Sequence, residues 1–316
     1  MNDSTIWTEK FRPQRFEDIK GQKKIVQRIK AFVDQQNMPH LMLAGPAGVG
    51  KSTIALVIAK ELFKDTWKNN LLELNASDDR GIDVVRNTIK EFAKTKSMGN
   101  VPFKIIFLDE CDSLTKEAQQ ALRRTMENYV LTTRFILSCN YSSKIIDPIQ
   151  SRCTIFRFKP LSVEDIEEYV KKIATSENLT LGKNTVKALV ELSSGDVRKI
   201  TNILQSCASI DKNITEELLF SLVSAAEPKE IKDILTLAIN RQFIKARSLL
   251  LDTMLKHGLS GIDILKQIQK ETLEFQGITD EKRIELVDKC GEIEFRMVEG
   301  SDEFLQLEAL LASYAK

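Results

Sequence analysis

Short apolar runs alternate with helical spacings along the first half of the chain. The apolar runs are "PHLMLAGP", "NLLELNA", "FKIIFLDE", "TRFILSCN" and "CTIFRFK", and each has the length of a strand. Between them, "STIALVIAKELF", "RGIDVVRNTIKEFAKTK" and "KEAQQALRRTMENY" carry apolar residues three to four positions apart, as on one face of a helix. This alternation predicts an α/β fold, with a parallel sheet covered by helices on both sides.

The pattern changes to mostly helical spacing after "KPLSVED". "SVED", Ser162 to Asp165, has the outline of a capping box at the start of an amphipathic run. Helices are expected around 162–177, 183–193 and 196–209. "AAEPKE" marks the next joint, and helical spacing then continues to Lys316 with breaks at "KHGLSG" and "QGITD". We therefore predict three domains: 1–160, an α/β core; 161–226, a helical domain; and 227–316, a second helical domain.

Composition places the chain among soluble proteins of a reducing compartment. Hydrophobic residues make up 42% of its 316 residues and charged residues 29%. No apolar run approaches the roughly 20 residues of a membrane span, and "MNDSTIWTEK" has no apolar signal region. The five cysteines are scattered without a C-x-x-C pair, which favours free thiols over zinc or disulfide frameworks.

The net charge of +1 hides an asymmetry between the two halves of the chain. Residues 1–160 hold 26 Lys and Arg against 18 Asp and Glu, whereas the remainder holds 20 against 27. A basic first half indicates a polyanionic partner there. A chance imbalance on a large surface is the alternative that charge alone leaves open.

"GPAGVGKS", Gly45 to Ser52, fits the phosphate-binding pattern G-x-x-x-x-G-K-[ST] between a predicted strand and a predicted helix. Glycines allow backbone N–H groups to turn onto phosphate oxygens at a helix N-terminus. Lys51 would reach the β- and γ-phosphates, and the Ser52 hydroxyl would ligate Mg²⁺. A Gly-rich turn with an incidental lysine is disfavoured, because spacing, residue types and flanking elements all agree.

Polar residues end two of the predicted buried strands. "IIFLDE" ends in Asp109, which can hold hydrated Mg²⁺, and Glu110, which can orient or deprotonate the attacking water. "FILSCN" ends in Asn140, whose amide could contact the γ-phosphate or the water; by itself such an Asn is usually a turn residue. Asp112 is interpreted as a helix N-cap or a surface acid.

A basic stripe follows the predicted helix of "RGIDVVRNTIKEFAKTK". Arg86, Lys90 and Lys94 recur every four residues, with Arg80 at the helix entry, and could follow the phosphates of one DNA strand. The alternative is an ordinary solvated helix face. No aromatic residues are interleaved, so the binding would be independent of sequence.

Taken together, the motifs resemble the AAA+ ATPases of the clamp-loader group, and within it the small subunits of replication factor C, of archaeal or eukaryotic type. Nearly the whole chain fits. The matching stretches are "WTEKFRP", "GPAGVGKS", "ELNASDDRGIDVVR", "FLDECDSL", "EAQQALRRTME", "SCNYSSKIIDPIQSRC" and "SGDVRK". The phosphate loop is common to many NTPases, whereas the combination of "EKFRP", "ASDDRGI" and "SRC" is far narrower.

The resemblance implies roles for individual residues. Asn140 matches sensor 1, Arg198 matches sensor 2, and Arg152 in "SRC" matches an arginine finger that acts in the neighbouring subunit's ATP site. Without the resemblance, Arg198 would be interpreted as a helix-surface charge and Arg152 as a strand-entry residue paired with Asp147. The residues expected to contact ATP are Thr8, Glu9, Lys10, Phe11, Arg12, Lys20, Gly45, Pro46, Ala47, Gly48, Val49, Gly50, Lys51, Ser52, Thr53, Asn140 and Arg198.

The resemblance also implies the assembly. It predicts an AAA+ P-loop ATPase core, a helical lid and a helical collar that joins several subunits in a ring. The expected cofactors are ATP and Mg²⁺. The expected partners are the large subunit and copies of small subunits, a sliding clamp, and primer-template DNA at Arg80, Arg86 and Lys90, with no membrane. The compartment would be the cytoplasm if archaeal and the nucleus if eukaryotic.

Three rival functions remain at this stage. The first is an ATPase of the same superfamily that remodels DNA junctions or loads helicases, although no winged-helix domain is evident in 226–316. The second is a catalytically silent scaffold that only donates Arg152, against which the intact Lys51, Asp109 and Glu110 argue. The third is a monomer that hydrolyses ATP alone, whereas a finger in trans predicts weak turnover until assembly.

Overall fold

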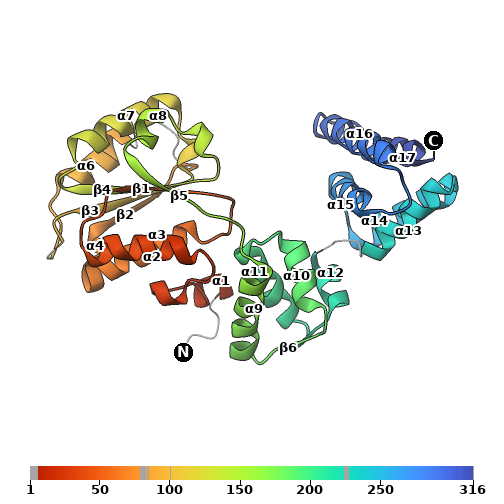
Figure 1. The fold of residues 1–316 in the computed structure, drawn as a ribbon, viewed down its shortest axis with the longest axis horizontal. Coiled ribbons are helices and arrows are strands. Elements are labelled where there is room, and N and C mark those ends of the chain that lie inside the picture. Colours follow the sequence, from red (N-terminus) through yellow and green to blue (C-terminus); the bar gives the residue numbers. More distant parts are fainter. Residues whose placement is uncertain (1–5, 79–82, 84, 100, 224–227, 316) are drawn as a thin grey trace. The chain divides into compact units, whose positions relative to one another are not determined.

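The computed structural model describes residues 6–78, 83, 85–99, 101–223 and 228–315 (Figure 1). The chain divides into two compact units. The first comprises Met1–Leu179 with Leu189–Gln205, and the second comprises Thr180–Ala188 with Ser206–Lys316. This division passes through the segment 161–226, so the domain limits inferred from the sequence stay predictions.

A five-stranded parallel sheet organises the first unit, as the sequence predicted (Figure 1). The strand order is β2-β3-β4-β1-β5. The strands are β1 (His40–Ala44), β2 (Leu71–Asn75), β3 (Lys104–Asp109), β4 (Thr133–Cys139) and β5 (Cys153–Arg157). Because all five strands are parallel, their carboxyl ends share one edge of the sheet, the edge at which α/β proteins bind ligands.

The register sets which functional segments become neighbours at that edge. Ala44, the last residue of β1, pairs with Cys139 of β4, and Asn75 pairs with Asp109 of β3. Since β4 lies between β1 and β3, the residue that follows β4 emerges between the loop after β1 and the acidic end of β3. Asn140 therefore stands next to the strand that carries Asp109.

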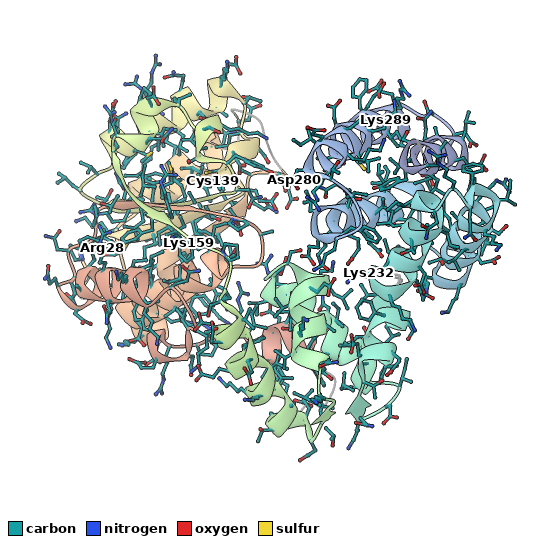
Figure 2. All side chains as sticks on the ribbon, turned by 45° about the vertical axis from the view of Figure 1, so that its right-hand side comes forward. Arg28, Cys139, Lys159, Lys232, Asp280 and Lys289 are labelled. Carbon is teal, nitrogen blue, oxygen red and sulfur yellow. The ribbon has the colours of Figure 1, made fainter. Side chains whose placement is uncertain are left out.

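Alternate residues of the strands face two separate hydrophobic cores. Leu41 and Leu43 of β1 pack with the helices α2 (Lys23–Asp34) and α3 (Lys51–Phe63) on one face. Met42 and Ala44 face the opposite core, which contains residues of α6 (Lys90–Lys94), α7 (Lys116–Asn128) and α8 (Asp147–Gln150). Cys139 belongs to this second core and is fully buried (Figure 2). The period of two along each strand thus produces a three-layer arrangement.

Short helical segments connect these layers. They are α1 (Trp7–Lys10), α4 (Trp67–Asn70) and the 3₁₀ turns Phe16–Asp18, Lys64–Thr66, Cys111–Ser113 and Ser142–Lys144. In α8 the N-cap is Ile146, and the helix runs from Asp147 with Pro in its first turn.

The helix expected to carry the basic stripe differs from the prediction. Val85–Ile89 is π-helical and α6 follows from Lys90, so the segment is no regular α-helix. A π-turn holds more residues than an α-turn, which alters the angle between residues four positions apart. Arg80 lies outside the described residues, as does the side chain of Arg86, and Lys90 is exposed.

Helical segments follow the sheet in the first unit and begin the second. The helix α9 (Val163–Glu177) starts as predicted, because the Ser162 hydroxyl accepts the Asp165 N–H as its N-cap. The remaining elements are α10 (Thr185–Ser193), α11 (Val197–Ala208), α12 (Glu216–Val223) and the two-residue parallel strands β6 (Thr180–Leu181) and β7 (Asn213–Ile214). The strand pair and α12 were not foreseen from the sequence.

Five helices form a separate hydrophobic core in the second unit. They are α13 (Pro228–Ile239), α14 (Phe243–His257), α15 (Gly261–Glu274), α16 (Asp280–Val298) and α17 (Glu303–Tyr314). The predicted breaks are confirmed: Gly258 caps α14 with a φ of 63°, and Ser260 and Thr279 are the N-caps of α15 and α16. Within the described part of the chain, no helix combines the length and apolar character needed to cross a bilayer.

Candidate nucleotide-binding site

The loop from Gly45 to Gly50 leads from β1 into the first turn of α3. Gly48 and Gly50 have φ angles of 70° and 95°, a conformation that glycine adopts without the strain of a side chain. The Gly45 N–H donates to the Cys139 carbonyl over 3.1 Å, which fixes the start of the loop to β4. The loop ends at the N-terminus of α3, where unpaired helical N–H groups and the helix dipole favour phosphate.

The Lys51 ammonium lies among neutral oxygens of the same loop and of β4. It donates to the Gly45 and Pro46 carbonyls over 2.6 and 2.7 Å and to Asn140 Oδ1 over 3.0 Å. Burial lowers the pKa of Lys51, and the nearby Asp109 carboxylate opposes that shift. A polyphosphate would exchange neutral acceptors for charged ones, which bind an ammonium more strongly.

Two oxygen ligands suited to Mg²⁺ lie together at the start of α3. The Ser52 hydroxyl donates to Asp109 Oδ2 over 2.5 Å. Mg²⁺ prefers oxygen ligands and usually keeps several waters beside one or two carboxylates and substrate phosphates. The pair Ser52 and Asp109 fits this donor set, and their role as metal ligands stays a prediction.

Glu110 follows Asp109 in a left-handed backbone conformation with a φ of 52°. Its N–H donates to Asp109 Oδ1 over 3.0 Å, and the residue is exposed. A non-glycine residue in this conformation is uncommon and costs free energy, so its retention is typical of functional turns. The turn directs the chain away from β3 immediately after the carboxylate that faces Ser52.

Asp112 ties the turn after β3 to the end of β4. Its two carboxylate oxygens accept the N–H groups of Asn140 and Tyr141 over 3.3 and 3.2 Å. This contact fixes the backbone that presents the Asn140 amide to Lys51. The sequence interpretation of Asp112 as an N-cap or surface acid missed this role, since the partners lie 28 and 29 positions away.

The first turn of α11 contacts the phosphate loop directly. Asp196 caps the helix, because its Oδ1 accepts the N–H groups of Arg198 and Lys199 over 2.8 and 3.1 Å. The Val197 N–H donates to the Gly48 carbonyl over 3.2 Å. A Cβ at Gly48 would stand 1.9 Å from Asp196 Oδ1. Glycine is therefore required at position 48 both for its backbone and for this close approach.

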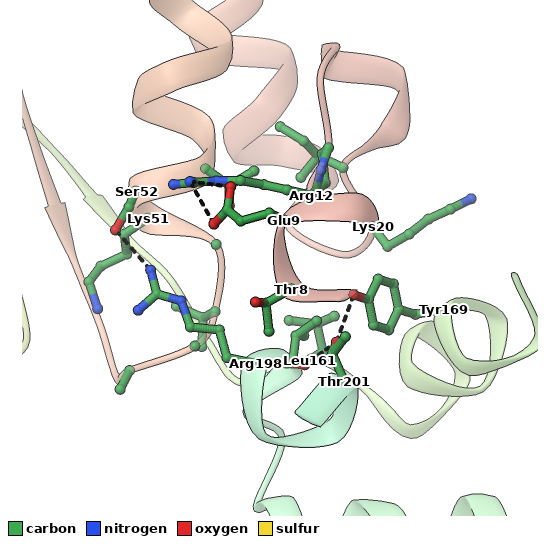
Figure 3. A pocket seen from close by; sticks show the side chains of 18 of the residues that line it. Thr8, Glu9, Arg12, Lys20, Lys51, Ser52, Leu161, Tyr169, Arg198 and Thr201 are labelled. Carbon is green, nitrogen blue, oxygen red and sulfur yellow. Dashed lines mark hydrogen bonds and ion pairs between the residues drawn. The ribbon is translucent and has the colours of Figure 1, made fainter. Parts of the chain in front are cut away.

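Arg198 extends from α11 into the site (Figure 3). Its Nη2 lies 3.4 Å from Ser52 Oγ. The side chain thus reaches the residue pair expected to hold the metal. Lys51, Asn140 and Arg198 place two positive charges and one amide around the same space.

The N-terminal segment forms another wall of this space. Arg12 Nη1 donates to Glu9 over 3.2 Å, and Thr8 lies beside Arg198 in the close-up (Figure 3). Lys20 forms an ion pair of 2.5 Å with Glu168 of α9. Lys10 and Phe11, which were expected in this strip, do not line the cavity; Lys10 instead pairs with Glu177 over 2.7 Å.

The cavity that these residues line has a volume of about 320 Å³, within the range of small-ligand sites. Of the expected ATP contacts, it is lined by Thr8, Glu9, Arg12, Lys20, Ala47, Gly48, Val49, Gly50, Lys51, Ser52, Thr53, Asn140 and Arg198, together with Asp109 and Glu110. Gly45 and Pro46 contribute through the loop but do not line it. Leu161, Tyr169 and Thr201 line it as well and were not foreseen, and the Tyr169 hydroxyl lies 2.9 Å from Thr201 Oγ1 (Figure 3).

Arg152 does not line this cavity. It lies between Ser151, the C-cap of α8, and the start of β5, and its side chain is 36% exposed. Its guanidinium pairs with Glu127 of α7 rather than with Asp147, the partner considered in the sequence interpretation. The structure thus separates Arg152 from the cluster that contains Lys51 and Arg198.

Three family models match consecutive parts of the chain. The model of the ATPase family associated with various cellular activities matches residues 41–161. The RFC1-like AAA+ ATPase lid domain matches 163–218, and the replication factor C C-terminal domain matches 226–313.

Full-length relatives are similar over nearly the whole chain. The replication factor C small subunit of Methanocella arvoryzae is 50% identical over 314 residues, which cover 99% of this chain and 97% of the relative. The replication factor C small subunit of Sulfolobus acidocaldarius is 48% identical over 316 residues, which cover 100% of this chain and 97% of that relative. Among solved structures, the RuvB Holliday junction branch migration motor of Thermotoga maritima has a TM-score of 0.56 with 17% identity, covering 76% of this chain and 85% of RuvB. That likeness shows the AAA+ fold alone.

Proposed function

The chain belongs to the replication factor C small-subunit family of AAA+ clamp-loader ATPases, and from this premise we propose how its own residues bind and hydrolyse ATP. The observation that carries the proposal is the convergence of Lys51, Ser52, Asp109, Asn140 and Arg198 around one cavity. These residues come from the phosphate loop, two strand ends and α11. Such a cluster suits the charge of a nucleoside triphosphate.

In this proposal the triphosphate lies along the phosphate loop and the first turn of α3. Lys51 exchanges its bonds to the Gly45 and Pro46 carbonyls for the β- and γ-phosphates. Arg198 contacts the terminal phosphate from α11, so binding ties the first turn of that helix to the loop more tightly. The remaining contacts in the cavity, including Thr8, Arg12 and Lys20, surround the nucleoside.

Ser52 and Asp109 would hold Mg²⁺, which neutralises phosphate charge when it is bound. Glu110 is placed one residue beyond Asp109 and accepts a proton from, or orients, the water that attacks the γ-phosphorus. Asn140 orients the same water or the γ-phosphate through its amide. Asp112 holds the Asn140 backbone for that task through its two carboxylate bonds.

Arg152 serves the ATP site of a neighbouring subunit. Its separation from the cavity of its own chain and its position beside an exposed surface support this assignment. Charge that develops on the transferred phosphoryl group is stabilised by an arginine from outside the site. The chain is therefore expected to hydrolyse ATP slowly until it is assembled.

The remaining expectations concern partners. We infer that the helices of 227–316 join this chain to copies of itself and to a large subunit, because Ile284, Phe295 and Val298 of α16 are each about two thirds exposed or more. The assembly would open a sliding clamp and place it on primer-template DNA, with Lys90 among the contacts. Since the relatives named above are archaeal, the cytoplasm rather than the nucleus is the expected compartment.

A mixing experiment tests the proposal. Assemblies that contain only Lys51→Ala or only Arg152→Ala copies should both lose ATP hydrolysis and clamp loading on primed DNA. When the two variants are mixed, an Arg152→Ala site can face an intact finger of a Lys51→Ala neighbour, so part of the turnover should return.

Two results would contradict the proposal. Unchanged hydrolysis in the Lys51→Ala assembly would show that ATP is not hydrolysed in the cavity that contains Lys51. No recovery in mixtures that demonstrably contain both variants in one ring would show that Arg152 acts in its own subunit. Nucleotide binding measured on each variant distinguishes the two roles. Lys51→Ala should lose ATP binding, and Arg152→Ala should keep it.

A further inference from the structure

The guanidinium of Arg152 is held on both of its terminal nitrogens by its own chain. Nη1 donates to the Pro148 carbonyl over 2.7 Å, and Nη2 pairs with Glu127 Oε1. A bidentate contact with a phosphate uses two neighbouring N–H donors, either Nη1 with Nη2 or Nε with one Nη, so each such pair includes a nitrogen that is held here. The observed arrangement therefore competes with any use of Arg152 on a neighbouring molecule.

Glu127 is shared between two arginines. Its Oε1 also accepts Nη1 of Arg123 over 3.1 Å, one helical turn earlier on α7. Glu127, Arg123 and Arg152 are 35%, 28% and 36% exposed in their side chains. The contacts are thus close to water, and an ion pair of this exposure is readily broken.

Arg123 is not fully satisfied in this arrangement. Its Nε is buried and has no hydrogen-bond partner within the described residues. A buried donor without a partner is unfavourable. If Arg152 turned away, the Glu127 carboxylate could move toward Arg123 and remain paired, so release of Arg152 would not leave an isolated charge.

We propose that Glu127 is a positioning residue that holds Arg152 against its own subunit and passes to Arg123 when Arg152 turns to a neighbour's phosphate. The inference rests on the proposed role of Arg152 in trans. Glu127 thereby restrains hydrolysis until the neighbouring subunit presents a triphosphate, whose charge exceeds that of one carboxylate. The restraint is weak enough to be reversed at each turnover.

The sign of the change in hydrolysis rate tells whether Glu127 restrains Arg152 or supports its action. In Glu127→Gln the side chain keeps its size but loses its charge, so Arg152 is held less tightly. We expect the single-turnover rate of ATP hydrolysis by the complete clamp-loader assembly to rise about two- to fivefold, the range of an exposed ion pair. ATP affinity should not change, because Glu127 lies outside the cavity.

Glu117→Gln is the matched control. Glu117 lies on the same helix, is exposed, and forms no ion pair with any residue that the structure describes, so the same loss of charge there should leave the rate unchanged. Arg123→Gln should slow hydrolysis, because Glu127 then keeps Arg152 as its sole arginine partner. Glu127→Gln and Arg123→Gln should change the hydrolysis rate in opposite directions and non-additively, whereas loss of a merely structural contact would lower the rate in both variants.

Comparison of Arg152→Ala with Glu127→Gln tests the role of Arg152 and the restraint by Glu127 separately. Arg152→Ala should abolish the gain when it is combined with Glu127→Gln. If Arg152→Ala alone leaves hydrolysis unchanged, the assignment of Arg152 fails. A second result would overturn only the restraint by Glu127. In that case Arg152→Ala abolishes hydrolysis, which keeps the assignment of Arg152, while Glu127→Gln leaves the rate unchanged or lowers it.

Discussion

Two arginines lie in contrasting surroundings in the first unit. Arg198 extends from α11 toward Ser52, beside Lys51 and the end of β4. Arg152 follows α8 at the surface and pairs with Glu127 outside the cavity. One region assembles Lys51 and Arg198 around a single space, whereas in the other Arg152 is held by a carboxylate and a carbonyl. These surroundings support the proposal that Arg198 serves the chain's own ligand and Arg152 that of a neighbour.

The two arginines also differ in how firmly their surroundings hold them. Asp196 and Val197 fix the start of α11 on the phosphate loop, so the backbone of Arg198 is held beside the cavity. Arg152 is bound through contacts that exchange readily, because they are partly exposed. Substitutions in the two regions should therefore separate binding from hydrolysis.

The largest effect is expected for Arg152→Ala in the complete assembly. Loss of an arginine finger costs about 10³- to 10⁵-fold in turnover, while the affinity of this chain for ATP should stay unchanged. Steady-state hydrolysis and fluorescent-nucleotide titration measure the two quantities. If Arg152→Ala also lowered ATP affinity, Arg152 would act on ATP binding as Arg198 does, contrary to the prediction.

Arg198→Ala should weaken both binding and hydrolysis. A hydrogen bond to a charged phosphate contributes about 1.5–3 kcal/mol, so ATP affinity should fall about ten- to hundredfold, with a further loss of rate. In mixed rings, an intact neighbouring finger should not restore these sites. Recovery on mixing would show that Arg198 acts across the interface instead.

Gly48→Ala tests the contact between the phosphate loop and α11. The added Cβ would meet Asp196 Oδ1 and displace the helix cap, in addition to straining a left-handed backbone. We expect ATP affinity to fall about tenfold, because loss of an N-cap costs about 1 kcal/mol and the strain adds to it. Gly50→Ala is the control: its φ of 95° is also left-handed, but no atom lies within 4 Å of the added Cβ, so the loss there should be smaller.

The smallest effect is expected for Asp112→Asn, which replaces one carboxylate acceptor by a donor. One of the bonds to the Asn140 and Tyr141 N–H groups is lost, worth about 0.5–1.5 kcal/mol. Hydrolysis should slow about two- to tenfold with little change in ATP affinity. Unlike Arg152→Ala, the defect should stay with the chain's own site in mixed rings. Recovery by a neighbour would argue against this positioning role.

Much of the core site could be predicted from local patterns. The phosphate loop, Asp109, Glu110 and Asn140 are all attached to strand ends, and a parallel sheet brings such ends to one edge. The helix limits at Ser162, Gly258 and Ser260 could also be inferred, because capping residues act within a few positions.

Other parts could not be inferred from neighbouring residues. The π-helical turn at Val85–Ile89 breaks the four-residue period on which the basic stripe was based. Asp112 finds its partners on another strand, and Tyr169 pairs with Thr201 from a different helix. Lys10 was expected at the nucleotide but pairs with Glu177 instead. Each of these contacts joins residues that are distant in sequence.

The sequence by itself determined the strands, the phosphate loop, the carboxylates after β3 and the family. These features depend on short-range periodicity and on backbone chemistry, which a few adjacent residues contain. Only the tertiary structure decided that α11 sits against Gly48, that Asp112 anchors Asn140, and that Glu127 rather than Asp147 pairs with Arg152. Those contacts form because packing brings the two partners within hydrogen-bond distance. Since the residues are far apart in the sequence, no local spacing predicts which of them will meet.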